Sequence, residues 1–237
     1  IMGYFLVKWH MDALIFYHFS RKLTGSTFNA FEYFITILEK NKDFKLIFLN
    51  ASESDIDYFC KIFENRYYLE DIDYRSNIIC RDFCSIVKIN QNLKRALILD
   101  YGTVSRLKPL LKCDKIIHIC EKTEEPEYRL DNRLSNVISF GEMPFAHKDV
   151  EYRMKLAFKR FKKLNKVDEA IYINSPFCEN YDFIGGLNLS KKPIILKAGS
   201  HLDNLFEKFD EYVYYHANKW FDPHPRLFLE CAFYNKK

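Results

Sequence analysis

Arg226 and Glu230 stand four residues apart in the segment DPHPRLFLECAF. This spacing places two side chains on one face of a helix, and Asp222 followed by Pro223 and Pro225 is typical of a helix start. A guanidinium matches phosphate oxygens, and a carboxylate matches the two hydroxyls of a ribose. The pair therefore has two interpretations. It is a solvent-facing salt bridge on a surface helix, or a charged clamp with Arg226 near phosphates and Glu230 accepting hydrogen bonds from ribose hydroxyls.

A short polar loop, SRKLTGST, follows an apolar run near the start of the chain. Ligands of open α/β sheets gather where strands end and helices begin, because helix N-termini offer free N–H groups. Thr24, Gly25 and Ser26 thus form a candidate loop near phosphates or an acceptor, with a plain turn and helix cap as the alternative. The loop matches neither GxGxxG nor GK[ST], which argues against a nicotinamide dehydrogenase and a phosphate-loop NTPase.

Another carboxylate, Asp100, follows the apolar run RALIL, which reads as a buried strand. A carboxylate at the end of such a strand could orient a hydroxyl or act as a general base. Capping of the next helix by Asp100 or Thr103 is the alternative.

Apolar runs alternate with amphipathic stretches, which predicts an α/β protein with mainly parallel sheets covered on both faces. In residues 1–145 we expect strands over 12–19, 44–50, RALILDYG and KIIHICE, and helices over 26–40, 52–65 and TVSRLKPLLKCD. The charged segment 121–142 is expected to be a surface excursion before a turn at Gly141 and Pro144. In residues 146–237 we expect strands in EAIYINSPF, KKPIILKAGS and EYVYYH, and helices over 148–164, HLDNLFEKFD and the final segment. In that last helix Leu227, Phe228 and Ala232 are expected to serve the core.

The composition is that of a folded chain without a dominant charge: 237 residues, 48% hydrophobic, 29% charged, formal net charge +4. The basic residues within 148–164 fit a solvated helix face better than a surface for phosphates or a negative polymer. Seven cysteines without a CxxC pair favour buried, reduced thiols over disulfides or zinc. Cys80 and Cys84, at i and i+4, could share a metal on a helix, but packing is the preferred interpretation. No apolar run approaches the roughly 18 residues of a membrane span, and no secretory signal is evident, so we expect a soluble, cytoplasmic protein.

The string YVYYHANKWFDPHPRLFLECAFYNK resembles the nucleotide-binding part of two-domain (GT-B) glycosyltransferases, in which a strand leads into a helix whose glutamate holds the donor ribose. The resemblance implies Glu230 as ribose ligand, with His224 and Arg226 near the donor diphosphate. The first strand, its SRKLTGS loop and the helix TFNAFEYFITILEK are similar to the start of the N-terminal domain of that fold. The family follows the nucleotide-binding helix with a further strand and helices, so we expect a short or incomplete second lobe.

These features predict two Rossmann-like lobes, an acceptor-side lobe over 1–145 and a nucleotide-sugar lobe over 146–237, with the donor bound between them. The resemblance implies transfer of a sugar from a nucleotide-sugar donor to an acceptor hydroxyl, without a metal or cofactor. The acceptor stays open among a glycan, a lipid-linked glycan and modified nucleic acid. The catalytic base is unassigned, with candidates His10, Asp12, His18 and Asp100. The alternatives are a non-catalytic or truncated α/β binding module and a nucleic-acid-associated protein.

Overall fold

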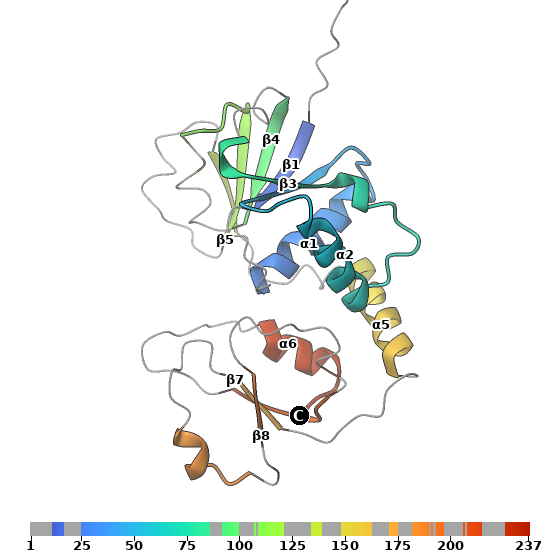
Figure 1. Cartoon of the computed structure of the whole chain (residues 1–237), viewed down its shortest axis with the longest axis vertical. Coiled ribbons are helices and arrows are strands. Elements are labelled where there is room, and N and C mark those ends of the chain that lie inside the picture. The colour runs from blue at the N-terminus through green and yellow to red at the C-terminus, as the bar shows by residue number, and fades with distance from the viewer. Residues whose placement is uncertain are drawn as a thin grey trace, which may run out of the picture. The chain divides into compact units, whose positions relative to one another are not determined.

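The computed structural model describes residues 11–16, 25–85, 92–99, 107, 109–120, 134–138, 148–162, 171–174, 182–189, 191, 193–196, 206, 208–214 and 226–237. The chain forms two compact units (Figure 1). Unit 1 contains Ile1–Arg21, Ser26–Lys61 and Glu70–Pro144, and unit 2 contains Lys22–Gly25, Ile62–Leu69 and Phe145–Lys237.

Unit 1 is built on a six-stranded sheet with the order β3-β2-β1-β4-β5-β6. Its strands are β1 (Met11–Phe16), β2 (Lys45–Leu49), β3 (Ile78–Arg81), β4 (Leu93–Ile98), β5 (Lys115–Cys120) and β6 (Leu134–Ile138). Every neighbouring pair is parallel. This is the strand order of a doubly wound, Rossmann-like sheet, in which the order reverses between β1 and β4. The predicted α/β class with a parallel sheet is therefore confirmed.

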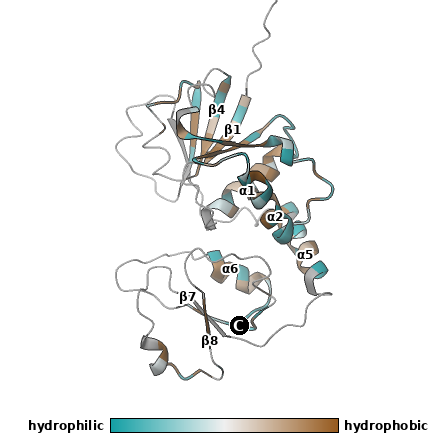
Figure 2. Ribbon diagram, viewed as in Figure 1, coloured by the Kyte–Doolittle hydropathy of each residue, from teal (hydrophilic) through white to brown (hydrophobic). Residues whose placement is uncertain are grey.

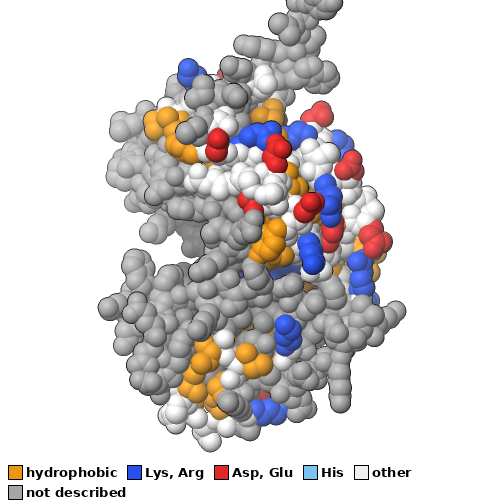
Figure 3. Space-filling view, in the orientation of Figure 1, with side chains coloured by type: hydrophobic (Ala, Val, Ile, Leu, Met, Phe, Trp, Pro, Cys, Tyr) orange, Lys and Arg blue, Asp and Glu red, His pale blue; other side chains and the backbone are white. Residues whose placement is uncertain are grey.

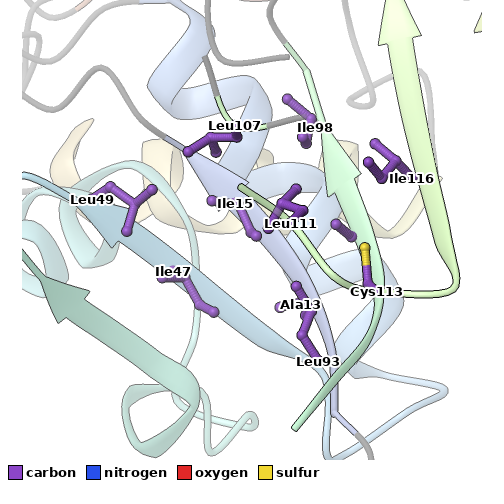
Figure 4. Close-up of a cluster of buried hydrophobic side chains, with 11 residues drawn as sticks. Ala13, Ile15, Ile47, Leu49, Leu93, Ile98, Leu107, Leu111, Cys113 and Ile116 are labelled. Carbon is purple, nitrogen blue, oxygen red and sulfur yellow. The ribbon is translucent and has the colours of Figure 1, made fainter. Parts of the chain in front are cut away.

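The continuous apolar strands follow from burial of both faces of this sheet. Ala13 and Ile15 point to one face, where they join a cluster that includes Leu107 and Leu111 (Figure 4). Leu14 and Phe16 alternate with them, and all four residues are at most 2% exposed. Because successive side chains of a strand point to opposite faces, only an apolar run without polar alternation can fill both sides.

Two helices, α1 (Gly25–Leu38) and α2 (Asp55–Arg66), accompany the sheet of unit 1. Phe59 of α2 stacks on Phe48 of β2 with ring centroids 4.8 Å apart, and both rings are fully buried. At the start of α2, the Asp55 carboxylate accepts hydrogen bonds from the backbone N–H and the hydroxyl of Ser52, at 2.9 and 2.7 Å. The predicted helices at 26–40 and 52–65 are thus present, with their ends shifted by up to three residues.

Two strands of unit 1 were not anticipated. Cys80 lies in β3, where it pairs with Phe48, and not on a helix that would bring it to Cys84. A four-residue strand carries little periodicity of its own, and it forms here because β2 offers a partner edge. Likewise β6 occupies part of the segment 121–142 that the charge pattern predicted as a surface excursion. Short 3-10 turns flank β3 at η1 (Arg75–Asn77) and η2 (Phe83–Ser85).

Unit 2 contains a smaller parallel sheet with the order β8-β7-β9. Its elements are α5 (Lys148–Lys162), β7 (Ile171–Asn174), the 3-10 turn η5 (Asp182–Gly186), β8 (Pro193–Leu196), β9 (Glu211–Tyr214) and α6 (Arg226–Phe233). The predicted helix 148–164 and the strands of the second half are present. Beside β9, Lys237 N–H donates to Asp210 O at 2.9 Å and Tyr212 N–H donates to Lys237 O at 2.7 Å, which is the pattern of parallel strand pairing.

Helix α6 ends in a compact cap. Lys236 N–H donates to Cys231 O and Asn235 N–H donates to Ala232 O, while Asn235 adopts a φ of 55°. This is a Schellman motif, and asparagine is one of the few residues besides glycine that accept the left-handed conformation. The cap fixes where the helix stops.

The apolar face expected for α6 is partly wrong. Leu227 is buried, but Phe228 is 56% exposed and Ala232 is also exposed. Figure 2 shows hydrophilic and hydrophobic residues side by side along α6. The helix instead buries Arg226 and Glu230 together with Leu227 and Cys231. The buried glutamate is compensated by an ion pair with Arg66, which lies elsewhere in unit 2.

Candidate functional site

The candidate site lies on α6, the helix that follows β9 of unit 2. Arg226 begins α6, and Glu230 lies one turn further on the same face. Nε of Arg226 donates to Oε1 of Glu230 at 2.7 Å. Arg226 is 7% exposed and Glu230 is fully buried. The i,i+4 pair exists as its spacing predicts, but it does not face solvent.

A second arginine completes the cluster. Arg66, the last residue of α2 and part of unit 2, forms an ion pair with the same Oε1 atom of Glu230. Its own exposed fraction is 6%, and its guanidinium lies 5.5 Å from the ring centroid of Phe206. Nη2 of Arg226 also donates to the hydroxyl of the fully buried Tyr67, at 3.3 Å. The Arg66–Glu230–Arg226 cluster thus joins residues 164 positions apart in sequence (230 − 66).

The backbone that carries Arg66 and Tyr67 is held by α5. Tyr68 N–H donates to Arg153 O at 3.0 Å, and Nη1 of Arg153 donates back to Tyr68 O at 2.8 Å. Arg160 lies over the Tyr68 ring at 5.3 Å from its centroid. These contacts fix the residues after α2 within unit 2.

The electrostatics of the cluster favour charged groups throughout. Burial by itself raises the pKa of Glu230, but Arg66 and Arg226 outweigh burial and hold this pKa below its ordinary value. Burial lowers the pKa of Arg66, and Glu230 chiefly outweighs it, so that this pKa is raised. Glu230 is therefore a carboxylate and both arginines are guanidinium cations at neutral pH.

The two oxygens of Glu230 differ in their surroundings. Oε1 receives both guanidiniums, whereas Oε2 is buried and accepts no hydrogen bond from the described part of the chain. A buried acceptor without a donor is unfavourable. Oε2 can accept hydrogen bonds from hydroxyl or amide donors of a ligand, and the cationic neighbours suit a ligand that is also an anion.

The other candidate residues lie on α1, on β1 or outside the described residues. Gly25 and Ser26 lie in the first turn of α1. Asp12 lies near the start of β1 and pairs with Arg95 of β4, whose Nε donates to it at 2.9 Å. The start of a parallel strand lies at the sheet edge opposite the one where ligands usually bind. The remaining candidates, His10, His18, Thr24, Asp100 and His224, are outside the described residues.

Several basic side chains of helix α5 pack or pair with other residues of unit 2. Arg153 is only 8% exposed, Lys155 lies over the Phe233 ring and pairs with Glu151, and Arg160 lies over Tyr68. On the face shown in Figure 3, acidic and basic side chains of the described residues are interspersed. This arrangement fits packing and a solvated face better than a track for a nucleic acid.

Two Asp-x-Asp strings bear on metal binding, at 55–57 and 71–73. Asp55 accepts hydrogen bonds from Ser52, and Asp57 pairs with Arg75 at 3.5 Å. Across the described ranges, no group of three or more His, Cys, Asp or Glu side chains is arranged to hold a metal ion.

Arg66 and Tyr67 are the site residues that the sequence did not reveal. Arg66 stands at the end of an ordinary amphipathic helix, and no spacing links it to α6.

Comparison of the chain with protein-family models, with curated proteins and with solved structures gives no match. None of the helices in the described residues combines the length and apolar character needed to cross a membrane.

Proposed function

We propose that the protein is a glycosyltransferase-like enzyme that binds a nucleotide-sugar donor in unit 2 and transfers its sugar to an acceptor hydroxyl. The parallel sheets of the two units support this proposal, because open parallel sheets bind ligands at the carboxyl ends of their strands. One observation carries it. Helix α6 follows the carboxyl end of β9 and presents a buried carboxylate with one oxygen on two guanidiniums and the other without a donor among the described residues.

In the proposed complex, Oε2 of Glu230 accepts hydrogen bonds from the ribose hydroxyls of the donor. Arg226 stabilises the negative charge that develops on the leaving diphosphate, and the N-terminus of α6 adds partial positive charge. No step of this scheme passes through a metal ion or a cofactor. Because Glu230 is fully buried, donor binding requires movement of the groups that enclose it.

The acceptor side of the reaction is proposed for unit 1, at the carboxyl end of β1, where the strand order reverses. Ser26, in the first turn of α1, begins the part of that helix that belongs to unit 1, and its backbone N–H is a candidate donor to the acceptor. The acceptor class stays open among a glycan, a lipid-linked glycan and modified nucleic acid. The catalytic base also stays open. Asp12, the one base candidate among the described residues, pairs with Arg95 at the start of β1, at the opposite edge of the sheet from the proposed acceptor site.

A calorimetric titration tests the donor site. The purified chain is titrated with uridine, guanosine and adenosine diphosphates and with their glucose conjugates. We expect one base to bind, and Glu230→Gln to weaken that binding about tenfold or more, because a hydrogen bond to a charged group is lost. Glu151→Gln is the matched control, since Glu151 is also a helical carboxylate in an i,i+4 pair but is partly exposed.

Three results would overturn parts of this proposal. Absence of binding to every nucleotide, in a chain that melts cooperatively, removes the donor site. Equal affinity in wild type and folded Glu230→Gln removes Glu230 as ribose ligand. Binding without sugar transfer to any acceptor or to water leaves a binding module and removes the enzymatic part.

A further inference from the structure

We infer that Arg66 is a second phosphate-binding guanidinium of the unit 2 site and acts beside Arg226 on one anionic ligand. This inference rests on the proposed function, because the ligand it assigns is the diphosphate of the nucleotide donor. It gives Glu230 a second role. Oε1 holds the two guanidiniums together as a positioning group, while Oε2 serves the ribose.

Two guanidiniums converge on one carboxylate oxygen. Arg66 and Arg226 come from different helices, yet both reach the same oxygen atom of Glu230. A guanidinium carries five N–H donors in a planar fork, so it can bind a carboxylate through one side and a phosphate through another. Two guanidiniums that share one carboxylate oxygen are close enough together to bind neighbouring oxygens of a diphosphate.

The charges of the cluster are almost completely buried. The three side chains are 5, 6 and 0% exposed for Arg66, Arg226 and Glu230. Electrostatic attraction is stronger where water is excluded than at the surface. An anion that reaches this cluster therefore interacts with two cations at low dielectric. The Glu230 carboxylate between them offsets the repulsion between the two guanidiniums.

Arg66 is held in place by its neighbours in unit 2. The Phe206 ring lies under its guanidinium, and the neighbouring backbone at Tyr68 is bonded in both directions to Arg153. A binding side chain with fixed surroundings loses little conformational freedom when a ligand binds. Such support is what a recognition residue requires.

The test uses inorganic pyrophosphate as the probe and the full chain as the protein. Calorimetry measures its affinity for wild type, Arg66→Gln and Arg66→Lys. We expect Arg66→Gln to weaken pyrophosphate binding about tenfold or more, and Arg66→Lys to recover part of the loss, because lysine keeps the charge but not the fork. Lys155→Gln is the control. It also removes a cation of unit 2, but one that pairs with Glu151 and lies over the Phe233 ring, so it is expected to keep wild-type affinity.

A second measurement keeps the inference testable if Arg66→Gln does not fold. The arginine Nε–H signals of wild type are followed by NMR during the pyrophosphate titration, and Arg66→Lys identifies the Arg66 signal. A shift of that signal at the same midpoint as the Arg226 signal supports the inference. An Arg66 signal that stays unchanged while pyrophosphate binds overturns it.

Failure of this inference is distinguishable from failure of the proposed function. If nucleotide sugars bind in a manner that depends on Glu230 and Arg66→Gln has wild-type pyrophosphate affinity, only the role of Arg66 is wrong. If pyrophosphate binds through Arg66 and no nucleotide sugar binds, the anion site stands and the donor assignment falls. If pyrophosphate does not bind wild type, Arg66 is a structural residue of the cluster.

Discussion

Replacing Glu230 by glutamine is expected to lower the free energy of unfolding of unit 2 by about 3–5 kcal/mol. The estimate follows from burial. Removing one partner of a buried charge cluster leaves uncompensated charge and costs about 3–5 kcal/mol, whereas an exposed i,i+4 pair contributes only about 0.3–0.5 kcal/mol. Glu230 is fully buried and its two partners are at most 7% exposed, so the larger figure applies. Glutamine keeps the shape of the side chain, and the variant therefore isolates the charge.

Urea unfolding followed by far-UV circular dichroism measures this effect. Because the chain has two compact units, two transitions are expected, and a two-state treatment is applied to each. At an m-value of about 1–3 kcal/mol per molar urea, a loss of about 3 kcal/mol moves the midpoint of unit 2 by about 1 M or more. Glu53→Gln is the control, because the Glu53–Arg81 pair spans 2.7 Å but its side chains are 76 and 40% exposed. It is expected to cost about 1 kcal/mol or less.

A triple replacement tests whether the cost arises from the unpaired charges. Changing Arg66, Glu230 and Arg226 together to methionine removes all three charges and fills similar volume, so it is expected to cost less than Glu230→Gln alone. If Glu230→Gln costs no more than Glu53→Gln, the cluster is not electrostatically coupled and the magnitude worked out above is wrong. If the triple variant is less stable than the single one, the cluster contributes net stability, contrary to the expectation for buried ion pairs.

Three further predictions follow from the same structure. Burial raises the pKa of Glu230, and its two guanidiniums lower this pKa more than burial raises it. The stability from the ionised form is therefore complete above the unfolded-state pKa of about 4.3 and is lost as the pH falls through the lower folded-state pKa. Urea unfolding of wild type and Glu230→Gln is expected to differ most at neutral pH and to converge at acid pH, below that lowered pKa; a difference that stays constant with pH would contradict the role of the charge. Burial raises the pKa of Cys80 and of Cys231 to about 12, so both thiols are expected to be unreactive in the folded chain. Peptide mapping after iodoacetamide treatment at pH 8 is expected to find both cysteines modified only in urea. Labelling of the native chain would contradict their burial. Phe48→Ala is expected to cost about 3–5 kcal/mol in the transition of unit 1 alone, because its fully buried ring stacks on Phe59; a matching shift in unit 2 would show that the two transitions do not report separate units.

The parallel architecture could be predicted because the residue pattern of each long strand shows that both of its faces are buried. In β1, the run from Ala13 to Phe16 has no polar alternation, and a strand buried on both faces is the physical reason. Strand β3 has only four residues and pairs through Phe48 and Cys80, so its existence depends on β2 more than on its own sequence. Strand β6 likewise lies in a charged segment without apolar periodicity, and its existence depends on pairing with β5.

The candidate site was half predictable. Spacing alone places Arg226 and Glu230 together on α6, because i and i+4 residues of a helix are neighbours. Spacing cannot reveal whether that face is wet or dry, since the answer depends on Arg66, which folds against it from the end of α2. The solvent-facing salt bridge and the charged clamp therefore looked equivalent in the sequence, and only tertiary packing separates them.

The orientation of α6 is the strongest reason to look for function there. A helix on the surface of a unit normally buries its apolar residues and exposes its charges, yet α6 fully buries Glu230 and leaves Phe228 56% exposed. Burying charges costs desolvation that apolar packing would avoid. Natural proteins depart from such local rules most often at functional sites. We therefore attribute the burial of Arg226 and Glu230, with Phe228 left exposed, to the proposed ligand and not to the stability that these charges provide. The explanation fails if the triple methionine variant, folded and more stable than wild type, binds nucleotides and pyrophosphate as wild type does.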